Sequence, residues 1–291
     1  MIDFTNAIEQ LNSYRGSEKK KTLIYNNKKY LVKFPDPVRE KNKNISYINN
    51  AFSEYVGSNI FKLIGFKTQN TELGVYEYGG KKKIVCACED FTDDDNVLYE
   101  FENLVLSTNP DKKIETELND IIDVIKESKM INTEETIEKF WDMFIVDSLI
   151  GNTDRHNGNW GFLYNANTDE VSLAPVFDCG SSLYPQADES IMQAVLNDKN
   201  ELNHRVFDMP LSAITYNGKK INYFKFISAA EFAECNEALK RITSRIDMEK
   251  IFEIIDSTPS ITELQKDFYK VMLSERKEHI LDFSLLNLQY K

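Results

Sequence analysis

Residues 151–161 read GNTDRHNGNWG and lie between an apolar helical pattern and a short apolar run. The stretch is more polar than a turn between a helix and a strand requires. Asp154 and Asn159 are five residues apart in it. Asp178 follows nineteen residues later, within the run FDCG. Mg²⁺ prefers hard oxygen ligands such as carboxylates and amides. The three side chains are therefore candidates for metal ligands or for the acceptor of a substrate proton.

The spacing of these residues resembles that of protein kinases. The catalytic aspartate and the metal-binding asparagine of the kinase catalytic loop have the separation of Asp154 and Asn159. Asp178 ends an apolar run and precedes small residues, as the metal-binding aspartate of the DFG segment does. Phosphoryl transfer requires charge neutralisation at the phosphates and a correctly placed hydroxyl. We therefore expect Asp154 to accept or orient the hydroxyl proton, and Asn159 and Asp178 to hold magnesium. An Asx turn is the structural alternative for the first two.

Lys33 lies in a strand pattern, where alternation places it on the same face as Leu31. A lysine on an apolar face needs an anionic partner. In kinases a strand lysine contacts the α- and β-phosphates and pairs with a glutamate of the following helix, and Glu54 is the candidate here. The alternative for Glu54 is a solvated charge away from the apolar stripe of its helix.

Other polar residues leave alternatives open. His156 is either a nucleotide contact or a hydrogen-bonding scaffold, and Arg155 pairs with either a phosphate or an acidic side chain. Ser13, Gly16 and Ser17 precede the first strand pattern, where a flap over the nucleotide is expected. A segment with one glycine between small and polar residues also suits an ordinary loop.

The first third of the chain predicts two β-hairpins and a helix. The hairpins cover residues 22–34, with a turn at Asn26-Asn27, and residues 71–88, with a turn at Gly79-Gly80. The helix covers residues 50–64 and ends at Gly65. We expect a small antiparallel sheet with the helix packed on it.

Beyond the acidic run at residues 93–95, which we expect to be a solvated linker, the pattern becomes helical. Asn132 and Glu135 form a capping-box pattern that opens a helix ending at Gly151. The remaining expected elements are strands at 161–164 and 171–177, and helices after residue 201 that include 231–246 and 262–286.

The composition limits the class of protein. Hydrophobic residues make up 42% of the 291 residues, which is enough for a core. Lys and Arg total 35 against 47 Asp and Glu, and the net charge of −12 disfavours direct binding of nucleic acid or anionic lipid. The four cysteines are scattered and predict reduced thiols rather than a zinc site.

The chain also lacks the sequence pattern of a membrane or secretory protein. It has no run of 18 apolar residues, and residues 1–10 do not resemble a signal peptide. We expect a cytoplasmic protein without a membrane span, and export without a signal peptide is the alternative.

Longer segments resemble the HipA-like serine/threonine kinases over most of the chain. They are YNNKKYLVKFP, FSEYVG, GNTDRHNGNWGF, APVFDCGSSLYPQAD, RIDMEKI and ERK. The resemblance implies an α+β, two-lobed protein-kinase-like fold. Its small β-rich N-lobe would cover residues 1–91, and its larger, mostly helical C-lobe would cover residues 92–291.

The resemblance also implies roles for individual residues. Asp154 would be the catalytic base, Asn159 and Asp178 the magnesium ligands, and Lys33 the residue that holds the phosphates. Ser13 would be the autophosphorylation site, with Ser17 as the competing acceptor. The hinge that contacts adenine would consist of Glu89, Asp90 and Phe91. The implied cofactors are ATP and Mg²⁺, and the implied partners are a protein substrate with a serine or threonine hydroxyl and an antitoxin-like protein.

Two other functions fit parts of the pattern. Asp-Arg-His followed by Asn at this separation also resembles phosphatidylinositol-kinase-like lipid kinases, although the net charge of −12 disfavours an anionic membrane substrate. A pseudokinase that binds a partner protein without catalysis is the second alternative. All the candidate phosphate and metal ligands are present, which favours an active enzyme.

Overall fold

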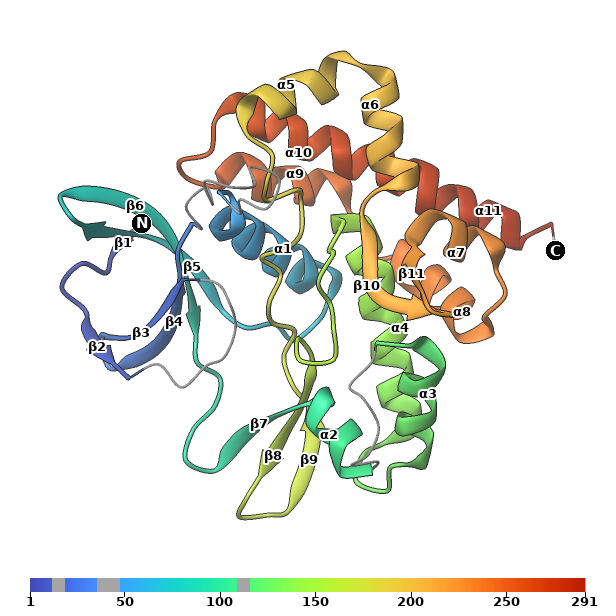
Figure 1. The fold of residues 1–291 in the computed structure, drawn as a ribbon, viewed down its shortest axis with the longest axis horizontal. Coiled ribbons are helices and arrows are strands. Elements are labelled where there is room, and N and C mark those ends of the chain that lie inside the picture. The colour runs from blue at the N-terminus through green and yellow to red at the C-terminus, as the bar shows by residue number, and fades with distance from the viewer. Residues whose placement is uncertain (12–18, 36–47, 109–115, 291) are drawn as a thin grey trace. The chain divides into compact units, whose positions relative to one another are not determined.

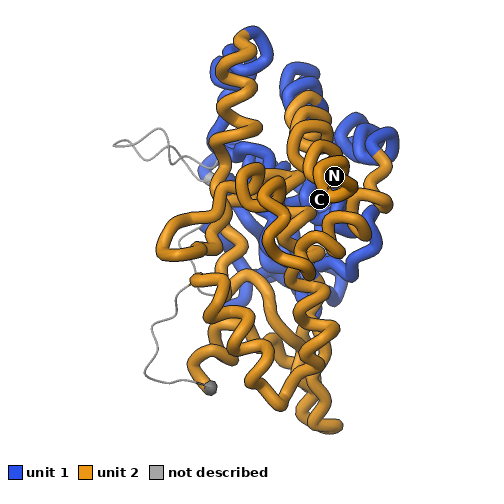
Figure 2. The backbone as a smooth tube through the Cα atoms, turned by 90° about the vertical axis from the view of Figure 1, so that its right-hand side faces the viewer, with its two compact units in different colours: residues 1–91, 176–197, 248–270 blue, residues 92–175, 198–247, 271–291 orange. Residues whose placement is uncertain are grey.

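A computed structural model describes residues 1–11, 19–35, 48–108 and 116–290. The predicted flap residues Ser13, Gly16 and Ser17 lie outside this part of the chain. The described residues form two compact units, which Figure 2 shows in different colours. The first unit comprises residues 1–91, 176–197 and 248–270, and the second comprises residues 92–175, 198–247 and 271–291.

The first unit contains a curled six-stranded sheet (Figure 1). Its strands are β1 (Ile2–Asp3), β2 (Ile8–Gln10), β3 (Lys20–Tyr25), β4 (Lys28–Lys33), β5 (Thr71–Tyr78) and β6 (Lys81–Glu89), in the spatial order β1-β5-β6-β4-β3-β2. The two predicted hairpins are β3–β4 and β5–β6. Asn26 and Asn27 have φ angles of 48° and 61°, and Gly79 and Gly80 also have positive φ. Two positive φ angles in a two-residue turn match the twist of the flanking strands.

The two faces of this sheet have different partners. One face carries the apolar core, which includes Phe4, Leu23, Val32 and Val85. On the other face, Lys33 lies directly opposite Cys86 in the β4–β6 ladder. Helix α1 (Asn50–Ile64) packs against β5 and β6 and ends at the left-handed Gly65, as predicted.

Two later segments complete the first unit. Val176 exchanges backbone hydrogen bonds with residues 67–69, at 2.8 Å each. Helix α9 (Met248–Ser257) packs on α1, and the rings of Tyr184 and Phe268 are in contact. The other helices of these segments are α5 (Glu189–Asn197) and the part of α10 (Glu263–Arg276) up to Lys270. These contacts join residues that are distant in the sequence, and the predicted lobe boundary between residues 91 and 92 stays a prediction.

The second unit is mainly helical. Its helices are α2 (Phe101–Thr108), α3 (Leu118–Glu127), α4 (Thr133–Ile150), α6 (Lys199–Asn203), α7 (Tyr223–Ala229), α8 (Ala233–Thr243) and α11 (Phe283–Leu288), with π-helical turns η2 (His204–Asp208) and η3 (Lys277–Asp282). Helix α4 packs against α3, α8 and η3, and every residue from 140 to 150 is buried. Asn132 caps α4 by accepting from the backbone N–H of Glu135 at 3.2 Å, as predicted. None of the described helices has the length and apolar character needed to cross a bilayer.

The strands of the second unit include three corrections to the sequence-based expectations. β7 (Asn96–Glu100) was not predicted, and it pairs with β8 (Gly161–Asn165), which pairs with β9 (Glu170–Leu173). The strand expected over 171–177 ends at Leu173, because Pro175 has no N–H to continue a ladder. A hairpin of β10 (Leu211–Tyr216) and β11 (Lys219–Asn222) interrupts the expected helices, and its Asn217-Gly218 turn is a recognisable hairpin signal.

Candidate active site

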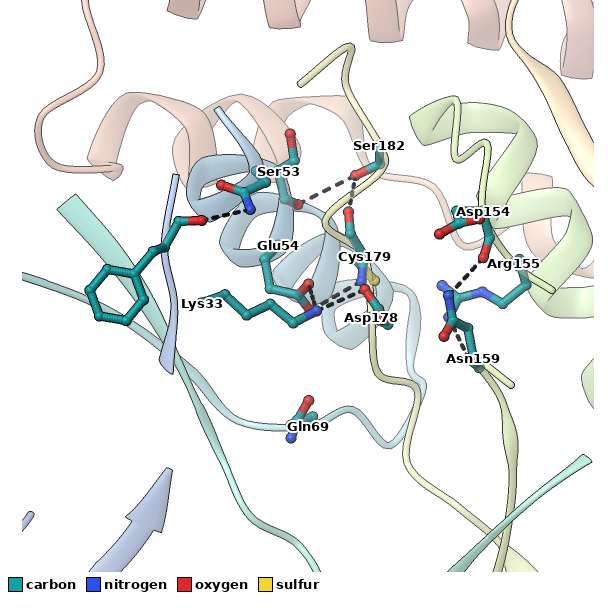
Figure 3. Close-up of polar contacts among 12 residues, drawn as sticks. Lys33, Ser53, Glu54, Gln69, Asp154, Arg155, Asn159, Asp178, Cys179 and Ser182 are labelled. Atoms are coloured by element: carbon teal, nitrogen blue, oxygen red, sulfur yellow. Dashed lines mark hydrogen bonds and ion pairs between the residues drawn. The ribbon is translucent and has the colours of Figure 1, made fainter. Parts of the chain in front are cut away.

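Three charged side chains meet on the α1 face of the first unit's sheet (Figure 3). Lys33 Nζ lies 2.7 Å from Glu54 Oε2 and 2.7 Å from Asp178 Oδ1. Lys33 is 4% exposed and Glu54 is fully buried. The expected ion pair is therefore present, and Glu54 is not a solvated charge.

Glu54 also fixes the segment that follows Asp178. Its second oxygen, Oε1, accepts from the backbone N–H of Cys179 at 3.1 Å. A Cβ atom on Gly180 would lie 3.2 Å from Glu54 Oε2, closer than side chains normally approach. Ser182 Oγ donates to the carbonyls of Ser53 at 3.3 Å and Cys179 at 2.7 Å. One helix therefore holds both Lys33 and the backbone beside Asp178.

Asp178 has a left-handed backbone conformation, with φ of 57°. This conformation costs free energy for residues other than glycine, although aspartate and asparagine tolerate it better than most. Such residues are frequent in functional sites, where the surrounding contacts hold them. At this position Lys33 holds the side chain and Glu54 holds the next backbone N–H.

In the second unit, a buried ion pair supports the polar loop at residues 151–161. Arg155 Nε donates to Asp147 Oδ2 at 3.0 Å, and Nη2 donates to Oδ1 at 3.2 Å. Arg155 Nη1 donates to the carbonyl of Asn159 at 2.8 Å. Arg155 is 3% exposed and Asp147 is 1% exposed. Arg155 therefore pairs with an acidic side chain, one of the two alternatives that the sequence left open.

Asn152 connects this ion pair to Asp154. Its Nδ2 donates to Asp147 Oδ1 at 2.9 Å, and its Oδ1 accepts from the backbone N–H of Asp154 at 3.0 Å. Asn152 is fully buried, whereas the side chain of Asp154 lies in an exposed position. The loop thus presents an exposed carboxylate on a buried polar scaffold. Neither Asp147 nor Asn152 was predicted as a site residue from the sequence, and the carboxylate of Asp147 within the apolar half of α4 was the available signal.

The same loop fixes Asn159 and His156. Asn159 Nδ2 donates to the carbonyl of Asp154 at 2.8 Å, which orients the amide (Figure 3). Among the described residues, none donates a hydrogen bond to Asn159 Oδ1. His156 Nδ1 accepts from the backbone N–H of Gly158 at 3.0 Å, and the His156 N–H donates to the carbonyl of Asp154 at 2.8 Å. These hydrogen bonds order the loop around His156, and its predicted nucleotide contact stays a prediction.

The expected hinge, residues 89–91, lies at the C-terminal end of β6 in the first unit. The Glu89 N–H donates to the carbonyl of Asn70 at 2.8 Å, and the Glu89 carbonyl accepts from Gln69 Nε2 at 3.0 Å. The rings of Phe91 and Phe177 lie 5.8 Å apart. Within the described part of the chain, the Phe91 N–H makes no hydrogen bond, and the adenine contact of this segment stays a prediction. No sequence signal indicated Gln69.

The charged hinge side chains are also paired. Lys28 Nζ lies 2.9 Å from Glu89 Oε1, and Lys29 Nζ lies 2.7 Å from Asp90 Oδ2. The Asp90 N–H donates to the carbonyl of Lys29 at 2.8 Å. The hinge is therefore tied to β4, the strand that carries Lys33.

The predicted site residues fall into two groups. Lys33, Glu54 and Asp178 meet in the first unit, which also holds residues 89–91, whereas residues 154–159 belong to the second unit. The described residues contain no cluster of three or more His, Cys, Asp or Glu side chains suited to a metal. The predicted magnesium ligands are one amide and one carboxylate, so they do not require such a cluster.

Comparisons with known proteins identify the family. The sequence model of the HipA-like C-terminal domain matches residues 12–258. The chain is also 44% identical over 301 residues to the serine/threonine-protein kinase CtkA of Helicobacter pylori strain J99, and the match covers 100% of this chain and 91% of the relative. The chain therefore belongs to the HipA-like family.

Two solved structures show the same fold. The crystal structure of the Helicobacter pylori proinflammatory kinase CtkA matches with a TM-score of 0.88 and 42% identity, over 99% of this chain and 98% of that chain. A chain from the Shewanella oneidensis MR-1 complex of HipA, HipB and operator DNA matches with a TM-score of 0.57 and 17% identity, over 97% and 67% of the two chains. The α+β, two-lobed protein-kinase-like fold predicted from the sequence is confirmed. The full-length relative places this chain in the enzyme class of serine/threonine protein kinases.

Proposed function

We propose that this chain transfers the γ-phosphoryl group of ATP to a serine or threonine hydroxyl of a protein, with Mg²⁺ as the metal cofactor. The main support is the buried Lys33–Glu54 ion pair, in which the same amine also contacts Asp178 at 2.7 Å. A lysine, a helix glutamate and a metal-binding aspartate are the phosphate-binding elements of protein kinases. A purely structural ion pair does not require a second carboxylate in a left-handed conformation.

Each residue has a distinct role in this proposal. The Lys33 amine, held by Glu54, donates to the α- and β-phosphates of the nucleotide. Asp154 presents its exposed carboxylate to the substrate hydroxyl and orients or accepts the proton. The hinge at residues 89–91 contacts the adenine through its backbone, and His156 completes the nucleotide site.

The residues present fit magnesium. Asn159 and Asp178 supply amide and carboxylate oxygens, which Mg²⁺ prefers over imidazole or thiolate. The hydrogen bond from Asn159 Nδ2 to the Asp154 carbonyl leaves the amide oxygen as the group that can coordinate a metal. When bound, Mg²⁺ would neutralise charge on the phosphate oxygens.

Partners other than ATP follow from the chemistry and the relatives. A serine or threonine kinase needs a protein substrate, and the Shewanella structure contains HipB and operator DNA alongside HipA. An antitoxin-like protein is therefore the partner we propose to test. The net charge of −12 argues against direct binding of nucleic acid by this chain. A cytoplasmic location stays a prediction.

The test of this function compares two acceptors. The purified protein is incubated with labelled magnesium-ATP and either a host-matched lysate or phosphoinositide vesicles. We expect label on proteins and none on lipid. Label on the vesicles alone would favour the lipid-kinase alternative. ATP binding without any transfer would favour the pseudokinase.

The same reaction tests autophosphorylation. We propose Ser13 as the acceptor and Ser17 as its competitor, on the basis of the family resemblance. A phosphoserine carries about −1.5 to −2 charges at neutral pH and would compete with the ATP phosphates for Lys33. Transfer should therefore slow as Ser13 becomes modified, and mass spectrometry of the flap peptide measures both sites. An active enzyme with unmodified Ser13 at complete peptide coverage would refute this regulatory step.

Asp178→Asn should remove the magnesium dependence of ATP binding. The substitution keeps the shape of the side chain but replaces the carboxylate that we assign to the metal. In the wild type, saturation at about 100 Kd stabilises the protein by about 2.7 kcal/mol, which raises the melting temperature. We expect the increment that depends on Mg²⁺ to disappear, while ATP alone in chelator still raises the melting temperature. Asp267→Asn on the exposed face of α10 is the control and should keep the increment that depends on Mg²⁺. If Asp178→Asn kept the same increment as this control, Asp178 would not be a metal ligand.

A further inference from the structure

A buried tyrosine contacts the loop that carries Asp154. Tyr223 is 1% exposed and opens α7, and its hydroxyl lies 2.6 Å from the backbone carbonyl of Asn152. Asn222 caps this helix by accepting from the Lys225 N–H at 2.9 Å. Tyr223 therefore lies at a capped helix N-terminus, and it contacts Asn152, which is 71 positions earlier in the chain.

Asn152, which accepts the hydrogen bond from Tyr223, makes hydrogen bonds with each of its four polar groups. The Asn152 carbonyl accepts from Tyr223, and its backbone N–H donates to the Asp147 carbonyl at 2.9 Å. Its side chain joins Asp147 Oδ1 to the Asp154 N–H. A shift of the Asn152 backbone must therefore break or stretch a hydrogen bond to the residue that presents the carboxylate.

The chemistry of the two groups shows which one donates in the hydrogen bond between Tyr223 and Asn152. A carbonyl oxygen only accepts, so the Tyr223 hydroxyl is the donor. Burial raises the pKa of the Tyr223 phenol, and the nearby Asp147 carboxylate raises it further. The phenol therefore stays protonated over the physiological pH range and keeps the proton that it donates to Asn152.

The ring of Tyr223 is held separately from its hydroxyl. Phe144 lies 5.2 Å away between ring centroids, and the guanidinium carbon of Arg276 lies 5.9 Å from the ring centroid. Arg276 donates from Nε and Nη2 to the Ser148 carbonyl, at 2.8 Å and 2.5 Å, near the end of α4. Removing the hydroxyl alone should therefore leave the ring in place.

We propose that Tyr223 is a positioning residue for phosphoryl transfer, whose hydroxyl holds Asn152 and, through it, Asp154. The expected effect of Tyr223 on the rate of phosphoryl transfer rests on the proposed kinase function. Its structural part, the ordering of the loop, can be measured without any activity. The two hydrogen bonds of the path, from Tyr223 to the Asn152 carbonyl and from the Asp154 N–H to Asn152 Oδ1, both lie within the second unit.

The test is Tyr223→Phe, with Tyr216→Phe as the matched control. Tyr216 lies in the same unit and packs on Phe226 and Phe232, and among the described residues its hydroxyl has no hydrogen-bond partner. Displacement of a reacting group by about 1 Å can cost about a hundredfold in rate. We expect kcat to fall by about tenfold to a hundredfold in Tyr223→Phe, with a smaller change in KM for ATP because Lys33 and Asp178 are not touched. The control should keep the wild-type kcat.

A second measurement separates positioning from stability and from the kinase assignment. Hydrogen exchange should show the Asp154 amide exchanging about tenfold faster or more in Tyr223→Phe, and unchanged in the control. The folded fraction at the assay temperature is measured by circular dichroism. A fall in kcat no larger than the loss of folded protein, or unchanged exchange at Asp154, would overturn the proposal. If the wild type transfers no phosphate, the kinase function fails while the exchange measurement still decides the role of Tyr223.

Discussion

Asp154→Asn is expected to lower the rate of phosphoryl transfer by about a thousandfold or more, which corresponds to at least about 4 kcal/mol of activation free energy. The side chain keeps its size but can no longer accept the proton of the substrate hydroxyl. The loop should keep its conformation, because Asn152 holds the Asp154 N–H and Asn159 holds its carbonyl. We therefore expect an unchanged melting temperature and unchanged affinity for magnesium-ATP.

Single-turnover transfer from labelled ATP measures this effect, because it is independent of product release. Asp123→Asn on the exposed face of α3 is the matched control and should behave as the wild type. Wild-type turnover in folded Asp154→Asn would show that another group positions or deprotonates the hydroxyl. A simultaneous loss of ATP affinity would instead place Asp154 in the nucleotide site.

The elements that the sequence predicted well depend on short-range physical signals. The Asn26-Asn27 and Gly79-Gly80 turns supply positive φ angles at two consecutive residues, and both hairpins form around them. Gly65 and Gly151 terminate α1 and α4 in the left-handed conformation. Asn217-Gly218 carries the same kind of signal, so the missed β10–β11 hairpin was predictable from the residues.

Other features depend on contacts that no local pattern contains. β7 begins immediately beyond an acidic run, and it is a strand because it pairs with β8, from Asn96 opposite Asn165 to Glu100 opposite Gly161. Tyr223 reaches Asn152 across 71 residues, and nothing near Tyr223 in the sequence marks it. The spacing of Asp154 and Asn159 identified the loop, but not the Asp147–Arg155 ion pair that supports it.

The candidate site shows the same division between local and distant information. Lys33 was found from strand alternation and Glu54 from its place on the next helix, so the ion pair was predictable. The hydrogen bond from the Cys179 N–H to Glu54 joins residues 125 positions apart, and no local pattern predicted it. It is one of the contacts that join residues 176–197 to the first unit, together with the backbone hydrogen bonds of Val176.

Lys33→Met should destabilise the protein and abolish ATP use, and these two effects can be separated. Lys33 is 4% exposed and Glu54 is fully buried, so the substitution leaves a carboxylate without its cation in a site from which water is excluded. Loss of one partner of a buried ion pair typically costs about 3–5 kcal/mol. Urea unfolding measures this cost. Lys21→Met is the control, because the Lys21–Glu9 pair of the same sheet has a half-exposed glutamate and such pairs contribute about 1 kcal/mol or less.

The double variant Lys33→Met with Glu54→Gln isolates the role of the amine in catalysis. Glutamine is neutral, so no uncompensated charge is buried, and its amide oxygen can still accept from the Cys179 N–H. We expect most of the lost stability to return, because replacing a buried ion pair by neutral groups of similar volume is often close to neutral in free energy. Phosphoryl transfer should stay undetectable, since the positive charge on the phosphates is still missing. If transfer returned together with stability, Lys33 would be a structural residue, and the phosphate-binding role would belong to another cation.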